Sequence, residues 1–467
     1  MSRIAGLTNA SPEAAVHACV DVFDTSNSLP MKTVAIIAPD FCPSSMPPSL
    51  RSRFFTDHLR EFGWDPVVIT TAPEFYEWSV DPENEKLLRG DYEIIRTAAL
   101  PARWTRKFGI GDLGLRGLWH LWRALGALVK RRHVDMLLIT VPPNYPMILG
   151  RLANMRFGLP YVIDFQDPYV TDYYKTVASE QRPPKWRMAR AVAGCVEPFS
   201  IRRAAHLVSV DAAYLRHMPE RYDWLSSADI TGIQLGTEPA DFDYLRAHPR
   251  KNLIFDRGDG LRHISYVGRG GPDMLPVLRV IFRSVRHLAE TEPELMRRVR
   301  FHFVGTNYAT GNMIRELVMP LARELEVDSF VDEHPGRVAY LDALQTLLDS
   351  TALLVLGSTS AHYSASKLFP YILANRPLLP IFHADSSVVR IVEETRAGTA
   401  VTFGDAASLD NAQPEVECRL RELLRAPMDA RPSTDWNAFE PYTARSVCAA
   451  LAGVFEHAIL KYPSNPA

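Results

Sequence analysis

Two cationic side chains stand where the sequence could bind phosphate groups. Lys367 follows Ser364 and Ser366, residue types that favour the start of a helix, and a helix N-terminus offers free backbone N–H groups to an anion. Arg269 lies in a glycine-rich turn, 268–271, directly after an apolar run. Glycine lets a backbone approach a phosphate closely, and the guanidinium matches phosphate oxygens in shape. The alternatives are a solvated lysine beside a helix cap and an arginine that pairs with a nearby acid.

Carboxyl and amide side chains gather at the end of another apolar run. Asp164, Gln166 and Asp167 lie at or just beyond the carboxyl end of a strand predicted over 161–165. A carboxylate at such a place could orient a reacting hydroxyl group or stabilise a cationic transition state. The alternative is that Asp167, which precedes Pro168, only caps the following segment.

Three further basic residues belong to segments that could reach a ligand. Arg51 and Arg53 open a predicted helix after a loop rich in Pro and Ser, where they could contact a phosphate or remain solvated. His362 lies in a loop after an apolar run, where a lone histidine is more often structural than catalytic. The triplet 241–243 spells Asp-Phe-Asp, a pattern of some metal sites. It follows a chain crossing rather than a strand end, so we predict no metal site.

These residues are positioned by short apolar strands that alternate with helices. Continuous apolar runs favour strands that are buried on both faces of a parallel sheet. In the first half we predict strands over 32–38, 66–70, 134–141, 161–165 and 206–210, and helices over 50–62 and 145–157. In the second half we predict strands over 263–267, 299–304, 338–340, 352–356 and 378–382, and helices over 275–288, 313–325, 341–348, 366–374 and 388–394. This alternation predicts an α/β protein with two Rossmann-like domains.

The length and composition suit a two-domain globular protein. The chain has 467 residues, of which 47% are apolar and 23% charged, and a single core rarely grows beyond about 300 residues. We predict an N-terminal extension over 1–30, a first domain over 31–235, a second domain over 236–425 that opens with a linker at 236–262, and a helical tail over 426–467. The formal net charge of −2 gives no reason to expect a nucleic-acid partner.

The cysteines and the N-terminus bear on the compartment. The 5 cysteines are widely spaced and form no CxxC pair, which favours reduced thiols. The sequence has no run of about 18 apolar residues that would predict a membrane-spanning helix. Residues 1–30 lack the continuous apolar core of a secretory signal. We therefore predict a cytoplasmic protein.

Five stretches carry motifs whose order and spacing resemble one family. These stretches are 161–168 (YVIDFQDP), 233–238 (IQLGTE), 268–269 (GR), 301–305 (FHFVG) and 366–374 (SKLFPYILA). These stretches are similar to segments of retaining, family 4-like glycosyltransferases of the GT-B fold. The first resembles a strand end of that family's first domain, and the second resembles the entry to its second domain. The other three resemble segments within the second domain. That group builds bacterial polysaccharides. The resemblance extends over roughly residues 31–460.

The resemblance implies a fold, an activity and site residues. The fold would be GT-B, in which two Rossmann-like domains face each other across a cleft and a C-terminal tail packs back on the first domain. The activity would be metal-independent transfer of a hexose from a nucleotide diphosphate donor to a glycan or lipid-linked acceptor, with no cofactor. The matching positions are Lys367, Arg269, Ser366, Gly268 and Gly305 for the donor diphosphate, and Asp167, Asp164 and Gln166 for catalysis. Arg51, Arg53 and His362 are candidates for further phosphate or acceptor contacts from their places in the chain, not from the resemblance.

The chain departs from that family at two places. Many members carry two glutamates eight positions apart, and here those positions hold His362 and Pro370. The later glutamate usually contacts the donor's ribose. The family's glycine-rich first loop is replaced by 44–48 (SSMPP). Two alternatives stay open: a GT-B scaffold that binds a nucleotide or a partner without turnover, and a sugar-nucleotide epimerase. The epimerase would need clustered acid–base carboxylates and histidines, which the sequence does not identify.

One stretch is strongly basic although the chain as a whole is nearly neutral. Residues 103–132 hold eight Lys or Arg and one acid, with aromatic residues interleaved. At helical spacing the apolar residues share one face, which could lie on an anionic membrane or pack on the first domain's sheet. We favour packing for this face and contact with lipid head groups for the basic ends at 103–107 and 130–132. The prediction is a cytoplasmic protein held peripherally at the inner face of the plasma membrane.

Overall fold

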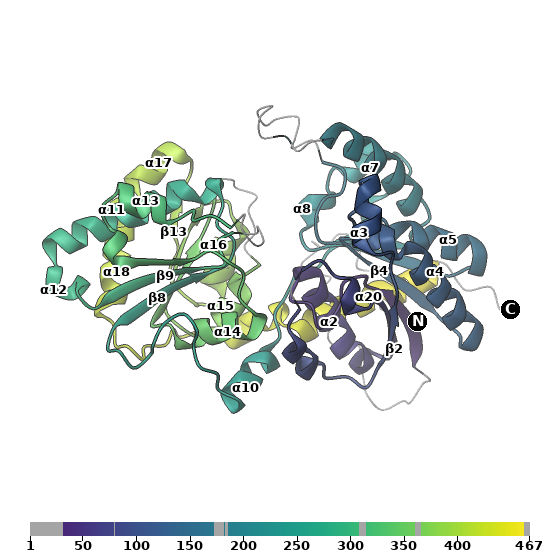
Figure 1. Cartoon of the computed structure of the whole chain (residues 1–467), viewed down its shortest axis with the longest axis horizontal. Helices are drawn as coiled ribbons and strands as arrows, with labels where there is room; N and C mark the ends of the chain where they lie inside the picture. Colours follow the sequence, from purple (N-terminus) through teal and green to yellow (C-terminus); the bar gives the residue numbers. More distant parts are fainter. Residues whose placement is uncertain are drawn as a thin grey trace, which may run out of the picture. The chain divides into compact units, whose positions relative to one another are not determined.

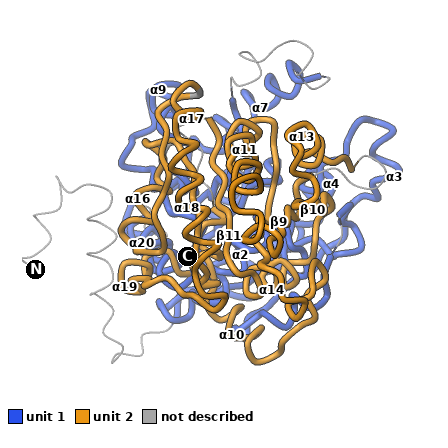
Figure 2. Tube along the Cα trace, turned by 90° about the vertical axis from the view of Figure 1, so that its left-hand side faces the viewer, with its two compact units in different colours: residues 1–236, 444–467 blue, residues 237–443 orange. Residues whose placement is uncertain are grey.

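The computed structural model describes residues 31–78, 80–171, 182, 185–307, 314–359 and 366–461. It divides into two compact units, coloured separately in Figure 2: unit 1 comprises 1–236 and 444–467, and unit 2 comprises 237–443. Residues 426–443, which the sequence analysis assigned to the tail, therefore lie in unit 2. The N–H of Thr237 donates to the carbonyl of Tyr442 at 3.0 Å, so the two ends of unit 2 lie side by side. The predicted extension 1–30 lies outside the described residues.

Unit 1 is built on a parallel sheet (Figure 1). Its described strands run in the order β3-β2-β1-β4-β5-β6-β7. Their bounds are β1 Lys32–Ile37, β2 Trp64–Thr71, β3 Glu93–Thr97, β4 Met136–Val141, β5 Tyr161–Phe165, β6 His206–Ser209 and β7 Ile230–Gly232. Side chains along β1, β2, β4 and β5 are buried almost throughout, as expected of a parallel sheet whose two faces are both covered.

Helices cover both faces of the unit 1 sheet. Their bounds are α2 Pro47–His58, α3 Ala102–Thr105, α4 Leu113–Arg131, α5 Met147–Phe157, α7 Trp186–Ile201, α8 Ala212–Leu215, α9 Met218–Arg221 and α20 Ala444–Lys461. One face packs on α2 and α20, and the other on α4 and α5. Trp64 of β2 meets Phe455 of α20 edge to face, with 5.0 Å between ring centroids. The last helix thus completes the core of the first unit.

Unit 2 is a second parallel sheet with its own core. Its described strands run in the order β10-β9-β8-β11-β12-β13. Their bounds are β8 Arg262–Val267, β9 Val299–Val304, β10 Val331–His334, β11 Ala352–Leu356, β12 Leu378–His383 and β13 Val401–Phe403. The helices are α10 Pro239–Ala247, α11 Leu275–Thr291, α12 Pro293–Met296, α13 Met319–Glu324, α14 Tyr340–Asp349, α15 Leu368–Ala374, α16 Ser387–Glu394, α17 Ala406–Asn411, α18 Gln413–Arg425 and α19 Trp436–Phe439.

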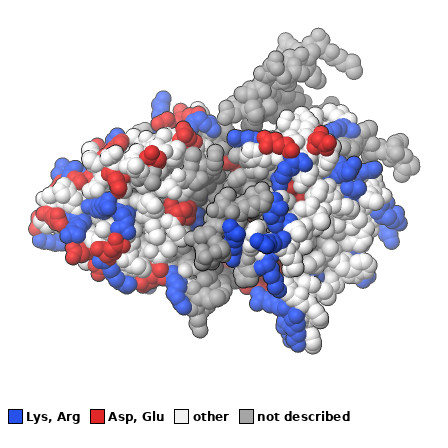
Figure 3. Space-filling model, turned by 90° about the horizontal axis from the view of Figure 1, so that it is seen from above, with Lys and Arg blue, Asp and Glu red and all other residues white. Residues whose placement is uncertain are grey.

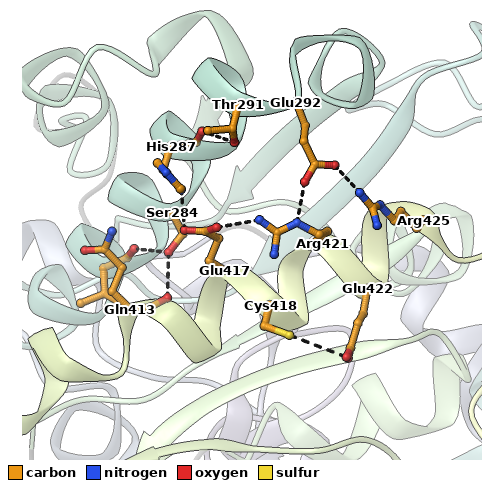
Figure 4. Close-up of polar contacts among 11 residues, drawn as sticks. Ser284, His287, Thr291, Glu292, Gln413, Glu417, Cys418, Arg421, Glu422 and Arg425 are labelled. Atoms are coloured by element: carbon orange, nitrogen blue, oxygen red, sulfur yellow. Dashed lines mark hydrogen bonds and ion pairs between the residues drawn. The ribbon is translucent and has the colours of Figure 1, made fainter.

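Charged side chains join α11 to α18 at the surface of unit 2 (Figure 4). His287 of α11 lies 2.7 Å from a carboxylate oxygen of Glu417 on α18. Arg421 and Arg425 of α18 both donate to Glu292, at 2.5 and 2.7 Å. These pairs surround the buried contact between the two helices. The pairs are only partly buried and remain in contact with solvent, so each contributes little to stability compared with the apolar contact beneath them.

The structure confirms the predicted fold class and most elements. The helix predicted over 50–62 is α2 followed by a 3₁₀ turn, and it ends at Gly63, whose φ of +80° suits glycine at a helix end. The strand predicted over 338–340 does not exist, and the edge strand of this region is β10. The short strands β3, β7 and β13 were not predicted. None offers a long continuous apolar run, and two of them are only partly buried.

The predicted linker at 236–262 contains a helix, α10. Its first residue is Pro239, which suits the first helical position, and the side chain of Glu238 accepts a hydrogen bond from the N–H of Ala240 at 3.1 Å. This capping pattern outweighs the Gly, Pro and Asp composition on which the linker prediction rested.

The basic stretch 103–132 spans α3, a 3₁₀ turn (η4 Arg106–Phe108) and α4. The apolar face of α4 packs on the sheet, as favoured from the sequence: Leu125 is buried, and Trp122 stacks on Phe157 with 5.4 Å between ring centroids. Trp119 is the exception, since it is 64% exposed. Within the described part of the chain, no helix is both long enough and apolar enough to span a bilayer.

Candidate functional site

The loop that follows β8 is held by two tyrosine hydroxyl groups. The hydroxyl of Tyr266 donates to the carbonyl oxygen of Arg269 at 2.6 Å. The hydroxyl of Tyr371, on α15, accepts from the N–H of Val267 at 2.6 Å and donates to the carbonyl of the same residue at 3.1 Å. Both tyrosines are buried. The backbone beside Arg269 therefore has one well-defined position.

Lys367 lies against this loop, just before α15. Its ammonium group donates to the hydroxyl of Tyr266 at 2.6 Å and lies 4.6 Å from the centroid of that ring. Burial, followed by the nearby Arg269 guanidinium, lowers the pKa of Lys367 to about 7. The side chain of Arg269 is only partly buried and lies 3.2 Å from a carboxylate oxygen of Asp273. The structure thus brings together Lys367 and Arg269, 98 positions apart in the sequence.

Glycine is required at 268 because Lys367 occupies the space beside it. A Cβ at Gly268 would lie 2.4 Å from the ammonium nitrogen of Lys367, and the φ of +151° is itself unfavourable for other residues. The N–H of Gly268 donates to the carbonyl of Val304 at 2.8 Å, and the N–H of Gly305 donates to that of His334 at 2.8 Å. Because both N–H groups are already bonded to the neighbouring strands, these glycines shape the loops rather than offer N–H groups to an anion.

The start of α15 differs from its prediction. The helix begins at Leu368 with Lys367 in the capping position and no side-chain cap, so Ser366 is an exposed turn residue that precedes the cap. Ser364 and His362 lie outside the described residues. The cation of Lys367, rather than a serine-capped helix end, is the feature of this segment that suits an anion.

In unit 1, Arg51 and Asp164 bond to each other and are completely buried. The guanidinium of Arg51 donates to both carboxylate oxygens of Asp164, at 2.8 and 2.9 Å, and to the carbonyl of Gln234 at 2.8 Å. Both side chains are 0% exposed. A fully paired arginine and carboxylate of this kind anchor α2 to β5, which favours a structural role over the predicted phosphate and catalytic roles.

Arg53 is also buried within unit 1. Its guanidinium lies 3.6 Å from a carboxylate oxygen of Asp57, donates to the carbonyl of Leu87 at 3.3 Å, and sits over the Phe54 ring. Only 2% of the side chain is exposed. These contacts favour structural support of α2 over the predicted contact with a ligand.

Gln166 and Asp167, just beyond the end of β5, differ from Asp164 in their surroundings. Gln166 is 7% exposed, and neither atom of its side-chain amide has a hydrogen-bond partner among the described residues. Buried amides are nearly always bonded, so the Gln166 amide is a candidate for contact with a ligand or a water molecule. Asp167 is exposed, although nearby protein atoms partly desolvate its carboxyl group and raise its pKa.

Two tyrosines near this strand end were missed from the sequence. Tyr145 follows β4 and Tyr169 follows β5, and their side chains share a hydrogen bond. Burial, with the nearby Asp112 carboxylate, raises the pKa of both phenols, which therefore stay protonated as donors at neutral pH. Tyr266 of unit 2 was missed in the same way. The available signal was a tyrosine within a few residues of a strand end.

No metal centre is formed within 31–78, 80–171, 185–307, 314–359 and 366–461. No group of three or more His, Cys, Asp or Glu side chains in these ranges could hold an ion. Asp241, the first residue of the Asp-Phe-Asp triplet, is buried in α10 and accepts a hydrogen bond from the hydroxyl of Tyr340 at 2.8 Å.

Comparison with known proteins gives a family match for unit 1 and structural matches for the whole chain. Residues 53–231 match the model of a glycosyl transferase 4-like domain. A trehalose-phosphate synthase from Burkholderia vietnamiensis superposes with a TM-score of 0.58 at 11% identity, covering 92% of this chain and 100% of its own. A sucrose-phosphate synthase from Thermosynechococcus elongatus gives 0.55 at 14% identity, with 92% and 100% covered.

A third structure of the same fold contains ligands. HepE from Anabaena, solved in complex with UDP and glucose, superposes with a TM-score of 0.52 at 11% identity, covering 91% of this chain and 99% of its own. No curated protein matches the sequence of this chain. At these identities the structural likeness establishes the fold and leaves the chemistry to be argued from the residues.

Proposed function

We propose that this GT-B chain, whose residues 53–231 match a glycosyl transferase 4-like domain, transfers a sugar from a nucleotide diphosphate donor to an acceptor hydroxyl group. The observation that carries the proposal is the pair of cations, Lys367 and Arg269, at the carboxyl end of β8. Ligands of open α/β sheets bind at such strand ends. The bound UDP of the Anabaena relative is consistent with a nucleotide diphosphate as the ligand of this fold.

In unit 2, Lys367 and Arg269 would hold the donor diphosphate. Lys367 already lies within a buried environment that costs its charge free energy, and an anion would relieve that cost. Arg269 can exchange Asp273 for a phosphate because both members of that pair are partly exposed. Gly268 leaves the space in which Lys367 lies.

In unit 1, Gln166 and Asp167 would meet the acceptor. The unmatched amide of Gln166 can both donate to and accept from sugar hydroxyl groups. Asp167 could accept a hydrogen bond from the attacking hydroxyl or stabilise positive charge at the anomeric carbon. Neither residue is paired in the way that Asp164 is, which makes them better candidates than Asp164 for contact with the substrate.

The chemical step would break the bond between the anomeric carbon and the diphosphate oxygen and form a bond from the same carbon to the acceptor oxygen. The acceptor's proton would pass to the leaving diphosphate on the same face, which retains the anomeric configuration. We propose that no metal is needed, since two cations hold the diphosphate. We also propose a hexose as the sugar, a glycan or lipid-linked precursor of a cell-surface polysaccharide as the acceptor, and the cytoplasm as the location.

The test is sugar transfer from a donor panel. The protein is incubated with radiolabelled UDP-, GDP-, dTDP- and ADP-hexoses and a bacterial membrane extract, with EDTA present in parallel samples. We expect incorporation from one donor class that EDTA does not abolish. Lys367→Ala should lose nucleotide diphosphate affinity, whereas Lys251→Ala, which removes the only other lysine of unit 2, should not. Nucleotide binding without transfer or donor hydrolysis would instead identify a non-catalytic scaffold.

A further inference from the structure

Two exposed aromatic side chains stand beside cations at the turn between α3 and α4. Phe108 is 84% exposed and Trp104 is 58% exposed, the former the most exposed of the large apolar residues described. The guanidinium of Arg103 and the ammonium of Lys107 lie 5.8 and 5.2 Å from the centroid of the Trp104 ring. One exposed apolar side chain is ordinary, but exposed aromatic side chains that gather beside cations mark an interaction surface.

The residue that precedes α7, Lys185, lies close to this turn in space although it is far from it in the sequence. The ammonium of Lys185 lies 3.8 Å from the place that a Cβ on Gly109 would occupy. Met188, in the first turn of α7, is 60% exposed. The basic aromatic patch is accordingly defined as Arg103, Trp104, Lys107, Phe108, Lys185 and Met188.

The two segments of the patch contain no acidic residue. None occurs in 98–111 or in 185–196, and Glu197 is fully buried. Arg106 of the same turn does pair with an acid, Glu77, at 2.8 Å. On the face seen in Figure 3, Lys and Arg outnumber Asp and Glu on the part of the surface that belongs to unit 1, whereas the two signs alternate over unit 2.

The other basic end of the stretch 103–132 is engaged with the sheet. Arg131 pairs with Glu93, and Arg132 pairs with Asp65 at 2.6 Å and with the hydroxyl of Thr33. These ion pairs engage two of the three cations of that end, and Lys130 is exposed. The turn at 103–108 differs from the rest of the stretch because two exposed aromatic side chains lie there and cations stack on one of them, whereas Trp119 of α4 is a single exposed ring.

We propose that the basic aromatic patch docks unit 1 onto the surface of an anionic lipid bilayer. Lys and Arg are attracted to anionic head groups, while Trp, Phe and Met side chains gain free energy by entering the boundary between head groups and acyl chains. A soluble polyanion would satisfy the cations but would leave Phe108, which is 84% exposed, in water. Bilayer docking accounts for both.

The test uses the full chain and sedimentable vesicles. One set contains only phosphatidylcholine, and the other contains phosphatidylcholine and phosphatidylglycerol in equal parts. We expect binding to the anionic set that weakens with added salt. Lys107→Ala and Lys185→Ala should each lower the affinity about fivefold, the effect of one cation near the bilayer surface. Lys251→Ala, in unit 2, is the matched control and should bind like the unchanged chain.

A second measurement separates a bilayer from a soluble polyanion. Trp104→Ala with Phe108→Ala should weaken vesicle binding at every salt concentration while leaving binding to heparin unchanged. The tryptophan emission of the unchanged chain should move to shorter wavelength when anionic vesicles are added, and this shift should shrink in Trp104→Phe. Trp436→Ala, which removes an exposed tryptophan of unit 2, is the control for the aromatic changes.

Two results would overturn the proposal. One is equal binding to neutral and anionic vesicles, and the other is anionic binding that survives loss of both aromatic side chains. The latter would identify a polyanion site. This inference goes beyond the proposed function and is independent of it, because vesicle binding is measured without donor or acceptor. A chain that transfers sugar but does not bind vesicles would contradict the docking proposal and leave the proposed function intact.

Discussion

Lys367 is the residue whose environment makes the clearest prediction about proton linkage. Its pKa is lowered to about 7 by burial and by Arg269, so the ammonium and amine forms are both populated near neutral pH. A bound diphosphate favours the ammonium form and raises this pKa. We therefore expect protons to be taken up on binding, and affinity to fall as pH rises above 7, by up to about tenfold per pH unit. Calorimetric titration with UDP in buffers of different ionisation enthalpy measures the uptake.

The matched variant for that experiment is Lys367→Arg. The guanidinium keeps the positive charge but does not titrate in this range, so binding should persist without proton uptake. A pH-independent affinity of the unchanged chain between pH 7 and 9 would remove Lys367 from the site. The pH dependence of folding stability has its own direction. Because the unfolded chain holds the Lys367 proton more tightly than the folded chain does, the contribution of Lys367 to the stability of unit 2 rises with pH above its folded pKa.

The Arg51–Asp164 pair predicts a stability effect rather than a catalytic one. Asp164→Asn leaves the guanidinium of Arg51 buried without its counter-charge, which should cost about 3–5 kcal/mol of the free energy of unfolding of unit 1. Urea unfolding followed by tryptophan fluorescence is suitable, because Trp436 is the only one of the 8 tryptophans that belongs to unit 2. Loss of activity in Asp164→Asn with unchanged stability would instead restore the catalytic interpretation.

Residue types and local order identified candidates but not their partners. The residues Lys367, Arg269, Gln166 and Asp167 were named because each lies beside a strand or helix end. The same reasoning placed Arg51, Arg53 and Asp164 in the site, and the structure shows them paired inside unit 1. Arg51 and Asp164 are 113 positions apart, so no pattern in the sequence shows that they meet. A solvent-facing carboxylate and a buried, paired one look alike in a sequence.

At the scale of elements, α20 determines whether unit 1 has a complete core. The helix carries buried Leu451, Phe455 and Ala458 against the sheet face that also holds Trp64. Phe455→Ala should lower the free energy of unfolding of unit 1 by about 3–5 kcal/mol, since it removes a buried aromatic ring and leaves a cavity. Urea denaturation measures this loss.

The control for Phe455→Ala is a change at the next residue of α20, Glu456. Glu456→Ala removes a side chain that is 40% exposed and pairs with Lys32 at 2.5 Å, and it should change the stability by less than about 1 kcal/mol. Equal effects of the two changes would mean that α20 is held by its surface ion pairs rather than by its apolar face.

Elements with a strong local signal were predictable, and edge elements were not. Strands such as β4 and β11, in which every residue is buried, are continuous apolar runs in the sequence. The edge strand β10 has only Val331 fully buried, so its four residues carry no such run. Helix α10 was missed because composition was weighed above the cap formed by Glu238 and Pro239.

At the scale of the whole molecule, unit 2 is an insertion between the last strand and the last helix of unit 1. It has its own core, and its ends lie side by side at Thr237 and Tyr442. We expect the excised segment 237–443 to fold alone, with one cooperative thermal transition by circular dichroism. If the donor site is as proposed, this segment should also bind a nucleotide diphosphate, and its Lys367→Ala variant should not. An excised segment without a cooperative transition would contradict the independence of the unit.

The sequence by itself determined the α/β class and the order of most strands and helices, because these follow from local hydrophobic periodicity and the residues that end each element. Only the tertiary structure decided which polar side chains remain available for a ligand. Lys367 rests on Tyr266, 101 positions away, and Asp164 is neutralised by Arg51. Availability depends on contacts between distant segments, and burial and charge pairing at those contacts are set by packing rather than by any local pattern.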